Sequence, residues 1–291
     1  MKKFLKNIII FAFGVLALNF ILYIFVFKPA FFERYLYNED TIEDYNLFLL
    51  SDSHGGYLKE IPSQNKIFNF SYPHENYLDM FMKIKYLTSI ISEGDTILLS
   101  IDNHSLSTYR DDYGRADENI IFVKDIEGIN PTDLESNYNL SRIMRYFPLA
   151  KPSYNKFILT YLKGFILETK NNTNYSKLSS EQKKIACQNR YVLQFENEKM
   201  SFKQKKYLTK IISLCKTKNI TLIGIKFPIT KEYWEIMGHQ DFGIDKFWHE
   251  QGLKIIDLHD LFFDKDQYFE DQDHLNVKGG ELFCKEIHKY L

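Results

Sequence analysis

The residues FLLSDSHGG, Phe48 to Gly56, decide the fold expected for this chain. Three apolar residues stop in a serine, an aspartate, a second serine, a histidine and two glycines. A buried strand that ends in small polar residues delivers their side chains to the carboxyl edge of a parallel α/β sheet, where ligands usually bind. Two chemistries fit the stretch. Either Ser53 is a nucleophile, or Asp52 and His54 are the first ligands of a dinuclear metal site.

Further short apolar runs predict the rest of a parallel sheet. The five expected strands are Asn46–Leu50, Lys66–Phe70, Thr96–Ile101, Thr221–Phe227 and Lys254–Leu258. Helical patterns are expected at Glu75–Ser92, Phe202–Thr217, Lys231–Met237 and Gly279–Tyr290. Because short strands alternating with helices are typical of βαβ units, we predict an α/β domain. Its expected architecture is a three-layer flavodoxin-like sandwich around a five-stranded parallel sheet.

The alternation of strands and helices breaks between about residues 110 and 200. This segment holds scattered prolines and the polar run ETKNNTNYSKLSSEQKK, Glu168–Lys184. We interpret it as an insertion with some helix, around Tyr154–Leu167, and some mobile loop. The whole domain is expected to cover residues 29–291.

Residues 1–28 are expected to form a signal-anchor outside this domain. The run Ile8–Phe27 carries no charge and is about as long as a helix that crosses a bilayer of roughly 30 Å. The residues after it offer no good small-x-small cleavage site, which favours an uncleaved anchor. Lys2, Lys3 and Lys6 precede the span. The positive-inside tendency therefore predicts a single-pass protein of the cell membrane, with its domain on the extracytoplasmic side.

Composition argues against two broad classes of protein. The chain of 291 residues is 45% hydrophobic and 26% charged, which is typical of a globular protein and not of a disordered one. A formal net charge of -1 without a long basic run argues against nucleic-acid binding. The three cysteines, Cys187, Cys215 and Cys284, lack metal-ligand spacing, so we expect buried free thiols. A Cys187–Cys215 disulfide is the alternative in an oxidising compartment.

Polar residues after two other predicted strands complete a hydrolytic constellation with Ser53. The third strand ends in SIDNHSL, which puts Asn103 at the same sheet edge. An amide there can donate to a developing oxyanion, an interaction worth about 3 to 4 kcal/mol in serine hydrolases. After the last strand stands YFEDQDHLNVKGGELF, in which Asp271 and His274 are three residues apart. That spacing lets the carboxylate bind one imidazole nitrogen and leaves the other to act as a base.

These blocks resemble those of the SGNH (GDSL-like) hydrolase superfamily over about residues 46–106 and 220–291. The resemblance implies that SDSH supplies Ser53 as nucleophile, that DNH supplies Asn103 as oxyanion donor, and that DQDH supplies Asp271 and His274. It implies no cofactor and no metal. The fold expected from the alternation of elements is the one that this superfamily has.

Two departures from the family pattern lie close to the nucleophile. The glycine usual before the DS pair is Ser51 in this chain. The family's second block should fall in NFSYPHENY, Asn69–Tyr77, which contains no glycine. By position, His74 is the candidate for the backbone N–H donor of the oxyanion hole, since Pro73 has no N–H.

The anchor narrows the resemblance to one branch. A single N-terminal span before an SGNH-like domain is similar to the D-alanyl transfer protein of lipoteichoic acid synthesis and to alginate O-acetylation proteins. This implies a serine esterase or O-acyltransferase acting on acyl groups of cell-envelope polysaccharide, with a membrane-bound O-acyltransferase as partner. In that mechanism His274 takes the proton of Ser53, which attacks an ester or thioester carbonyl, and the acyl group passes to a hydroxyl or to water.

Two other hypotheses remain open. The missing second-block glycine motivates a catalytically inactive SGNH-fold scaffold, or a glycan-binding component of an envelope acylation system. A metallophosphoesterase is suggested by DSH, by Gly94-Asp95 and by DNHS at Asp102–Ser105. However, Gly94-Asp95 precedes a predicted strand and so should lie at the opposite end of the sheet, and no HxH pair follows. His54 and His104 are expected to be solvated or to lie behind the site.

Overall fold

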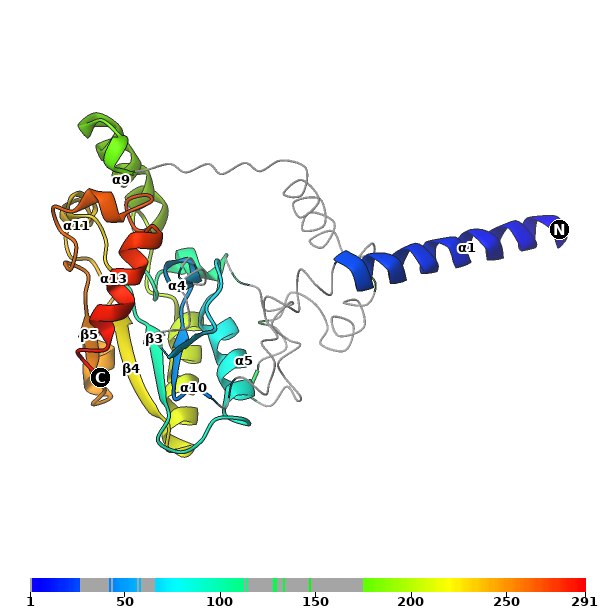
Figure 1. Cartoon of the computed structure of the whole chain (residues 1–291), viewed down its shortest axis with the longest axis horizontal. Coiled ribbons are helices and arrows are strands. Elements are labelled where there is room, and N and C mark those ends of the chain that lie inside the picture. The colour runs from blue at the N-terminus through cyan, green and yellow to red at the C-terminus, as the bar shows by residue number, and fades with distance from the viewer. Residues whose placement is uncertain are drawn as a thin grey trace. The chain divides into compact units, whose positions relative to one another are not determined.

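The computed structural model describes residues 2–26, 44–56, 66–112 and 175–291, with a few isolated residues between these ranges. The chain divides into two compact units, and the sheet belongs to the unit made of residues 42–124 and 172–291 (Figure 1). The helix expected around Tyr154–Leu167 lies outside the described residues. The domain limits at residue 28 and at about 110–200 stay predictions.

Helix α1, Lys2–Leu22, forms where the apolar run predicts it. Continued to Val26, it is the one helix in the described ranges that is long and apolar enough to cross a membrane, judged by length and composition alone. Large apolar side chains are exposed along its whole length, Phe4, Phe11 and Phe20 among them. Such a surface is favourable in lipid and unfavourable in water. The orientation across the membrane stays a prediction.

All five predicted strands are present, and they form one sheet in which every neighbouring pair is parallel. The strands are β1 (Leu47–Leu50), β2 (Ile67–Asn69), β3 (Thr96–Ser100), β4 (Thr221–Lys226) and β5 (Ile255–Asp257). Their order is β2-β1-β3-β4-β5. Strand β1 therefore lies inside the sheet, with β2 on one side of it and β3, β4 and β5 on the other. The crevice between the carboxyl ends of β1 and β3 is the place where ligands bind in open α/β sheets.

The strands are almost wholly apolar because their side chains are buried in both directions. Leu47, Leu49 and Leu98 point into a hydrophobic cluster that includes Phe283 and Ile287 of helix α13, Val277–Ile287. The residues that alternate with them along β1 and β3, and so point to the other face of the sheet, are also buried: Phe48, Leu50, Ile97 and Leu99. Continuous burial along a strand is typical of parallel sheets and explains why these segments do not alternate between apolar and polar residues.

Capping side chains determine where the helices begin. Helices α10 (Phe202–Thr217) and α11 (Lys231–Met237) have the predicted bounds. Helix α5, Tyr77–Leu87, is shorter than expected at both ends; it begins at Tyr77 because Asn76 forms a capping box with Asp79, and it ends before Thr88. Helix α13 begins two residues early because Asn276 accepts a hydrogen bond from the Gly279 N–H. Helices α5 and α10 lie side by side (Figure 1).

The segment interpreted as an insertion contains a helix that the sequence patterns did not predict. Helix α9 covers Ser180–Gln194, preceded by a short 3-10 turn, η8, at Tyr175–Lys177. The helix starts there because Ser179 and Gln182 form a reciprocal capping box, which satisfies two backbone N–H groups. Helix α12, Ile244–Glu250, was also not predicted, and its Trp248 is fully buried.

The cysteines are as expected from their spacing. Cys187, Cys215 and Cys284 are free and buried. Burial raises the pKa of the Cys215 and Cys284 thiols to about 12 in each case. They behave as small apolar side chains of the core.

The close approach of helix α13 to the preceding turn requires a glycine at position 279. A Cβ at Gly279 would lie 2.2 Å from the Tyr268 carbonyl oxygen, a backbone atom that cannot move by itself. We expect Gly279→Ala to lower the free energy of unfolding by about 1–3 kcal/mol, measured by urea denaturation. Val277→Ala is the matched control, because Val277 is exposed in the same helical turn and should change stability by less than about 0.5 kcal/mol. Equal effects of the two substitutions would contradict this packing.

Candidate active site

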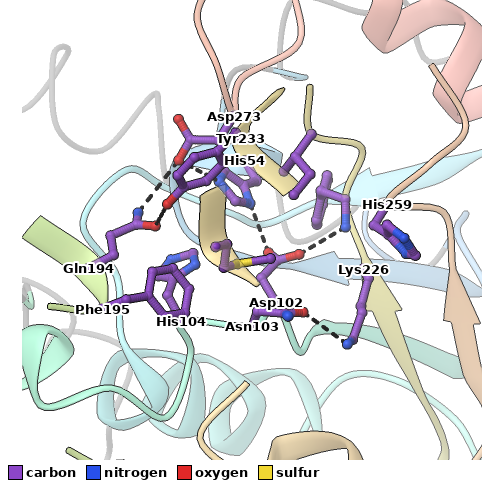
Figure 2. A pocket seen from close by; sticks show the side chains of 13 residues that line it. His54, Asp102, Asn103, His104, Gln194, Phe195, Lys226, Tyr233, His259 and Asp273 are labelled. Atoms are coloured by element: carbon purple, nitrogen blue, oxygen red, sulfur yellow. Dashed lines mark hydrogen bonds and ion pairs between the residues drawn. The ribbon is translucent and has the colours of Figure 1, made fainter. Parts of the chain in front are cut away.

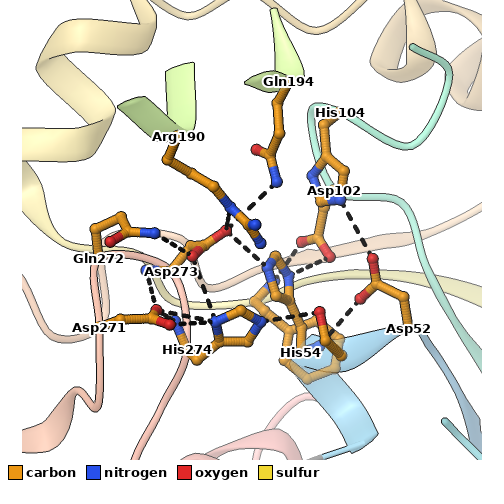
Figure 3. A network of polar contacts seen from close by, with 12 residues as sticks. Asp52, His54, Asp102, His104, Arg190, Gln194, Asp271, Gln272, Asp273 and His274 are labelled. Atoms are coloured by element: carbon orange, nitrogen blue, oxygen red, sulfur yellow. Dashed lines mark hydrogen bonds and ion pairs between the residues drawn. The ribbon is translucent and has the colours of Figure 1, made fainter. Parts of the chain in front are cut away.

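Three chain segments meet at the carboxyl edge of the sheet. After β1 the chain turns at once into the short helix α4, Ser53–Gly56. After β3 come Asp102, Asn103 and His104, and the third segment is the loop between β5 and α13. Because all five strands are parallel, these segments emerge on the same side. Figure 3 shows their side chains turned toward one another.

Ser53, His274 and Asp271 form a continuous hydrogen-bonded chain. The His274 Nε2 atom lies 2.8 Å from the Ser53 hydroxyl oxygen. On the other side of the ring, Nδ1 lies 2.8 and 2.9 Å from the two carboxylate oxygens of Asp271. A carboxylate on Nδ1 fixes the ring so that Nε2 can accept the serine proton. The predicted nucleophile, base and orienting acid are thus brought together at hydrogen-bond distance.

Local hydrogen bonds build the loop that carries His274. The backbone N–H groups of Asp273 and His274 both donate to one Asp271 oxygen, at 3.0 and 2.8 Å, which makes a tight turn. An isolated bridge pairs Phe269 with Leu275 across that turn. The spacing of three residues between acid and base therefore follows from a turn that Asp271 itself closes.

The turn that presents Ser53 is closed by glycine. The Gly55 N–H donates to the Ser51 hydroxyl at 3.2 Å. A Cβ at Gly55 would approach the Ser71 hydroxyl to 2.6 Å, so a larger residue would push apart the loops that follow β1 and β2. Ser51, where the family has glycine, thus has a structural role of its own.

Asn103 lies at the predicted sheet edge but contacts other residues. Its Nδ2 donates to the Gln240 carbonyl at 3.0 Å, and its Oδ1 accepts from Lys226 Nζ at 3.0 Å. Lys226 is buried and also pairs with Asp245 at 2.7 Å. The amide is therefore held in one orientation, although the hydrogen bonds that hold it do not involve Ser53. Its role as oxyanion donor stays a prediction.

His74 is exposed and has a backbone conformation that favours glycine. Its φ of 69° lies in the left-handed region, which a residue with a Cβ rarely adopts. The loop that carries it is tied to the nucleophile segment, since the Tyr72 N–H donates to the Ser51 carbonyl at 3.3 Å. Although the segment Asn69–Tyr77 contains no glycine, His74 thus adopts a backbone conformation that is usual for glycine. The role of its N–H in the oxyanion hole stays a prediction.

A buried ion-pair network lies directly behind the triad, and sequence patterns did not predict it. His54 Nδ1 lies 2.8 Å from Asp102, while His104 Nε2 and Arg110 each lie 3.2 Å from Asp52. The expectation that His54 and His104 lie in solvent or behind the site resolves in favour of the second, since both are buried.

A third buried carboxylate links this network to His274. Asp273 lies 3.4 Å from His274 Nδ1, 3.5 Å from His54 Nε2 and 2.7 Å from Arg190 on α9 (Figure 3). Asp273 stands inside the quoted DQDH block, so its position was visible in the sequence. Its partner Arg190 is 83 residues away, in the segment interpreted as an insertion, and no local pattern points to it.

The network shifts the pKa values of its two most buried carboxylates downward. Burial alone raises the pKa of Asp52, but His54, Arg110 and His104 outweigh it and hold that pKa well below the usual 3.8. Burial likewise raises the pKa of Asp273, and the charges of Arg190, His274 and His54 hold it well below 3.8. Both groups are therefore ionised in the folded protein at neutral pH.

The two buried histidines shift in opposite directions. Burial lowers the pKa of His54, but Asp102 and Asp52 outweigh it and raise that pKa well above 6.5. Burial dominates for His104, whose pKa lies below 6.5 although Asp52 faces it, because Arg110 and His54 repel its charged form. His54 is thus cationic and His104 neutral at neutral pH.

The same side chains raise the question of a metal centre. Two groups bring ligand atoms within 4.8 Å of one another, His54 with Asp273 and His274, and His54 with Asp52 and Asp102. Arg190 and Arg110 already pair with Asp273 and Asp52, and His54 pairs with Asp102, so a divalent cation would have to displace the arginines and deprotonate His54. As predicted, Asp95 lies at the opposite edge, where it accepts from the Ser92 N–H. We interpret the cluster as an ion-pair network.

A small pocket opens beside this network. Figure 2 shows that Asn103 and Lys226 line one side of it and that His54 and Asp273 line another. Phe195 and Phe227 add apolar surface. The pocket therefore joins the expected oxyanion donor to the buried charges.

Comparison with known proteins adds no relative. No protein-family model matches the chain, and no curated protein matches it. Membership of the SGNH superfamily therefore stays a prediction.

The depressed pKa of Asp52 makes folding sensitive to acid. A carboxyl whose pKa is lower in the folded state contributes stability above its unfolded value of 3.8 and loses it as the pH falls through the folded value. We expect Asp52→Asn to lower the free energy of unfolding by about 3 kcal/mol at neutral pH, and by progressively less below about pH 4. Urea denaturation over a pH series tests this. Asp260→Asn, at an exposed carboxylate, should show little change at any pH. A cost that is independent of pH would contradict the ion-pair assignment.

Proposed function

We propose that this protein is a membrane-anchored serine esterase or O-acyltransferase of the SGNH type, acting on acyl groups of cell-envelope polysaccharide. The observation that carries the proposal is the hydrogen-bonded chain Ser53–His274–Asp271, with 2.8 Å between nucleophile and base. A serine, an imidazole and a carboxylate in this order are the parts needed to activate a hydroxyl for acyl transfer. They come from segments 221 residues apart in the chain.

The proposed reaction uses these three side chains in sequence. His274 Nε2 takes the proton of Ser53 as its oxygen attacks an ester or thioester carbonyl, and Asp271 stabilises the imidazolium that forms. His274 then gives the proton to the leaving oxygen or sulfur, which leaves an acyl-serine. A sugar hydroxyl or water, deprotonated by His274, attacks this acyl-serine and releases Ser53.

The proposed oxyanion hole consists of the Asn103 amide and the His74 backbone N–H. An amide nitrogen carries two hydrogens, and the Gln240 carbonyl accepts one of those on Asn103. The second hydrogen is then available to the substrate oxygen. The Lys226 contact to Oδ1 supports this arrangement, because it keeps the NH₂ side of the amide turned away from Lys226.

The remaining parts of the proposal follow from the anchor and the strand order. A single N-terminal span suggests a domain on the extracytoplasmic side, beside a membrane-bound O-acyltransferase that supplies or receives the acyl group. Anchoring raises the effective concentration of partners in the same bilayer. The order β2-β1-β3-β4-β5 supports a flavodoxin-like three-layer sandwich, since that fold uses the same order.

A second candidate is a catalytically inactive scaffold or glycan-binding component of the same system. It is favoured by the engagement of Asn103 with Gln240 and Lys226, and by the missing glycine in the second block. A metallophosphoesterase has less support, because Asp95 lies at the wrong edge and arginines occupy the acidic groups.

Labelling with a fluorophosphonate probe separates catalysis from scaffolding. We expect the detergent-solubilised full chain to be labelled on Ser53, because a hydrogen-bonded histidine activates that hydroxyl, and Ser53→Ala to abolish the label. Ser89→Ala, at an exposed serine that only donates to the Tyr86 carbonyl, should label like the wild type. Absence of labelling in the folded wild-type protein would favour the scaffold.

The cellular role can be tested with the same residue. We expect Ser53→Ala cells to lose, or to change in level, the O-acylation of an envelope polysaccharide, while the protein stays folded and in the membrane. Deletion of residues 1–28 should leave activity on a small soluble ester but remove the cellular effect. If Ser53→Ala cells keep the wild-type pattern while deletion of the whole protein changes it, the scaffold hypothesis takes the place of this one.

The oxyanion assignment predicts a specific kinetic defect. We expect Asn103→Ala to reduce kcat on a small ester by about 10²-fold or more with little change in KM, because the lost interaction forms only in the transition state. Lys226→Met keeps the amide but removes the group that orients it, so a smaller loss of kcat is expected. Unchanged kcat in Asn103→Ala would remove Asn103 from the hole.

A further inference from the structure

The buried imidazole of His54 lies between two carboxylates. Its Nδ1 is 2.8 Å from Asp102 and its Nε2 is 3.5 Å from Asp273. A neutral imidazole carries one N–H, so only the doubly protonated ring can present a donor to both carboxylates. Asp102 is held in place by two further hydrogen bonds, because the Phe227 backbone N–H and the Ser100 hydroxyl donate to it at 2.9 and 2.6 Å. His54 Nδ1 makes a hydrogen bond to Asp102, whereas Nε2 makes none within the described residues and faces Asp273 as a longer ion-pair contact; a positively charged ring suits both contacts.

This cation is close to the catalytic base. The rings of His54 and His274 meet edge to face with 5.2 Å between their centroids. His274 Nδ1 faces two carboxylates, Asp271 at 2.8 Å and Asp273 at 3.4 Å. Each nearby anion attracts positive charge on an imidazole, and an imidazole that carries a proton on both nitrogens has no lone pair with which to accept the serine proton. A compensating positive charge near Asp273 therefore matters for the activity of the site.

The other charged groups around His54 are also accounted for. Asp52, in the preceding turn, accepts from the His54 N–H at 3.0 Å and is itself balanced by Arg110. The His104 ring lies 5.4 Å away, and its lowered pKa leaves it neutral. Arg190 from α9 shares Asp273, and Lys226 on β4, in the same pocket, pairs with Asp245.

We propose that His54 is a positioning residue for the general base. Its imidazolium, held between Asp102 and Asp273, offsets the second carboxylate at His274 and so sets the pH at which the base becomes active. This inference rests on the proposed function, because it concerns the same serine and histidine. It goes beyond that function by assigning a role to a residue outside the triad, which touches neither the substrate nor the reacting atoms.

The sign of the effect follows from the charges. Replacing His54 by glutamine keeps a polar side chain but removes the positive charge. The His54 cation then no longer repels a proton on His274, and it no longer offsets the negative charge of Asp273. Protonation of the base becomes easier, and a higher pH is needed to remove the proton. The acid limb of the pH profile therefore moves to higher pH, while the plateau at alkaline pH is largely retained.

The experiment measures the rate of Ser53 labelling by a fluorophosphonate on the full chain in detergent, between about pH 5 and 9. We expect His54→Gln to move the midpoint of the acid limb upward by about one pH unit. Asp273→Asn should move it downward, because it removes an anion from the base. His104→Gln is the matched control, a buried histidine of the same network that carries no charge to lose, and its limb should stay in place.

A structural role would give a different result. If His54→Gln lowers the rate by the same factor at every pH, or shifts the limb no more than His104→Gln does, the proposal is wrong. Should the variant fail to fold, the wild-type chain with ¹⁵N-labelled histidine provides a second test by NMR. The His54 ring, assigned through its contact with Phe227, must stay doubly protonated at pH values above the acid limb. A neutral ring there overturns the proposal.

The two proposals fail in distinguishable ways. If the probe does not label Ser53 in the folded wild-type protein, the proposed function is wrong and the role of His54 is wrong with it. If the wild-type protein is labelled on Ser53 and the Ser53→Ala variant is not labelled, but His54→Gln leaves the midpoint of the acid limb unchanged, only the role of His54 is wrong.

Discussion

A buried carboxylate cannot remain ionised unless cations and hydrogen-bond donors surround it, and the carboxyl edge of this sheet holds three such groups. Asp52 and Asp102 follow β1 and β3, and Asp273 precedes His274. The positively charged groups that pair with them, His54, Arg110 and Arg190, lie outside the strands. The need to neutralise these carboxylates therefore dictates which segments pack around the edge, and the triad is assembled on top of that packing.

The partners join segments that share no sheet hydrogen bonds. Arg190 brings α9 against the loop that carries His274, and Arg110 brings the turn η4, Thr108–Asp111, against the nucleophile segment. A hydrophobic contact would tolerate sliding between these segments, whereas an ion pair at about 3 Å does not. The Asp271 turn can then be short and partly exposed, since the buried groups behind it determine where it sits.

The sequence predicted the framework well because each framework signal is local. The apolar runs of β1 and β3 and the amphipathic patterns of α10 and α11 are complete within a few residues, and capping explains the shifts at α5 and α13. The triad was also predictable, since Asp271 and His274 form one turn and Ser53 ends a strand. Helix α9 had a local signal too, the SSEQ capping box, but its polar composition made it resemble a loop.

The buried network was not predictable, although most of its members lie in the motifs that were quoted. Asp102 stands beside Asn103, and Asp273 beside His274, yet neither position reveals whether its side chain faces solvent or the interior. The deciding partners are distant, as with Arg190, and pairing across 83 residues depends on the folded topology. Buried charged residues do not recur with the spacing of a strand or a helix. The apolar periodicity that predicts the core therefore does not predict which charged residues are buried.

The cost of the network indicates what it is for. Replacing buried ion pairs by packed apolar side chains is often neutral or stabilising, so stability alone does not explain three buried carboxylates at one edge. Apolar packing, however, supplies neither fixed charge nor directional contacts. The base at this edge lies between Asp271, whose side chain is 40% exposed, and Asp273, whose side chain is 1% exposed. Solvent screens the first charge and cannot screen the second. A buried anion at that distance needs a cation close to it, and Arg190 and His54 both lie against the same Oδ2 atom of Asp273, at 2.7 and 3.5 Å.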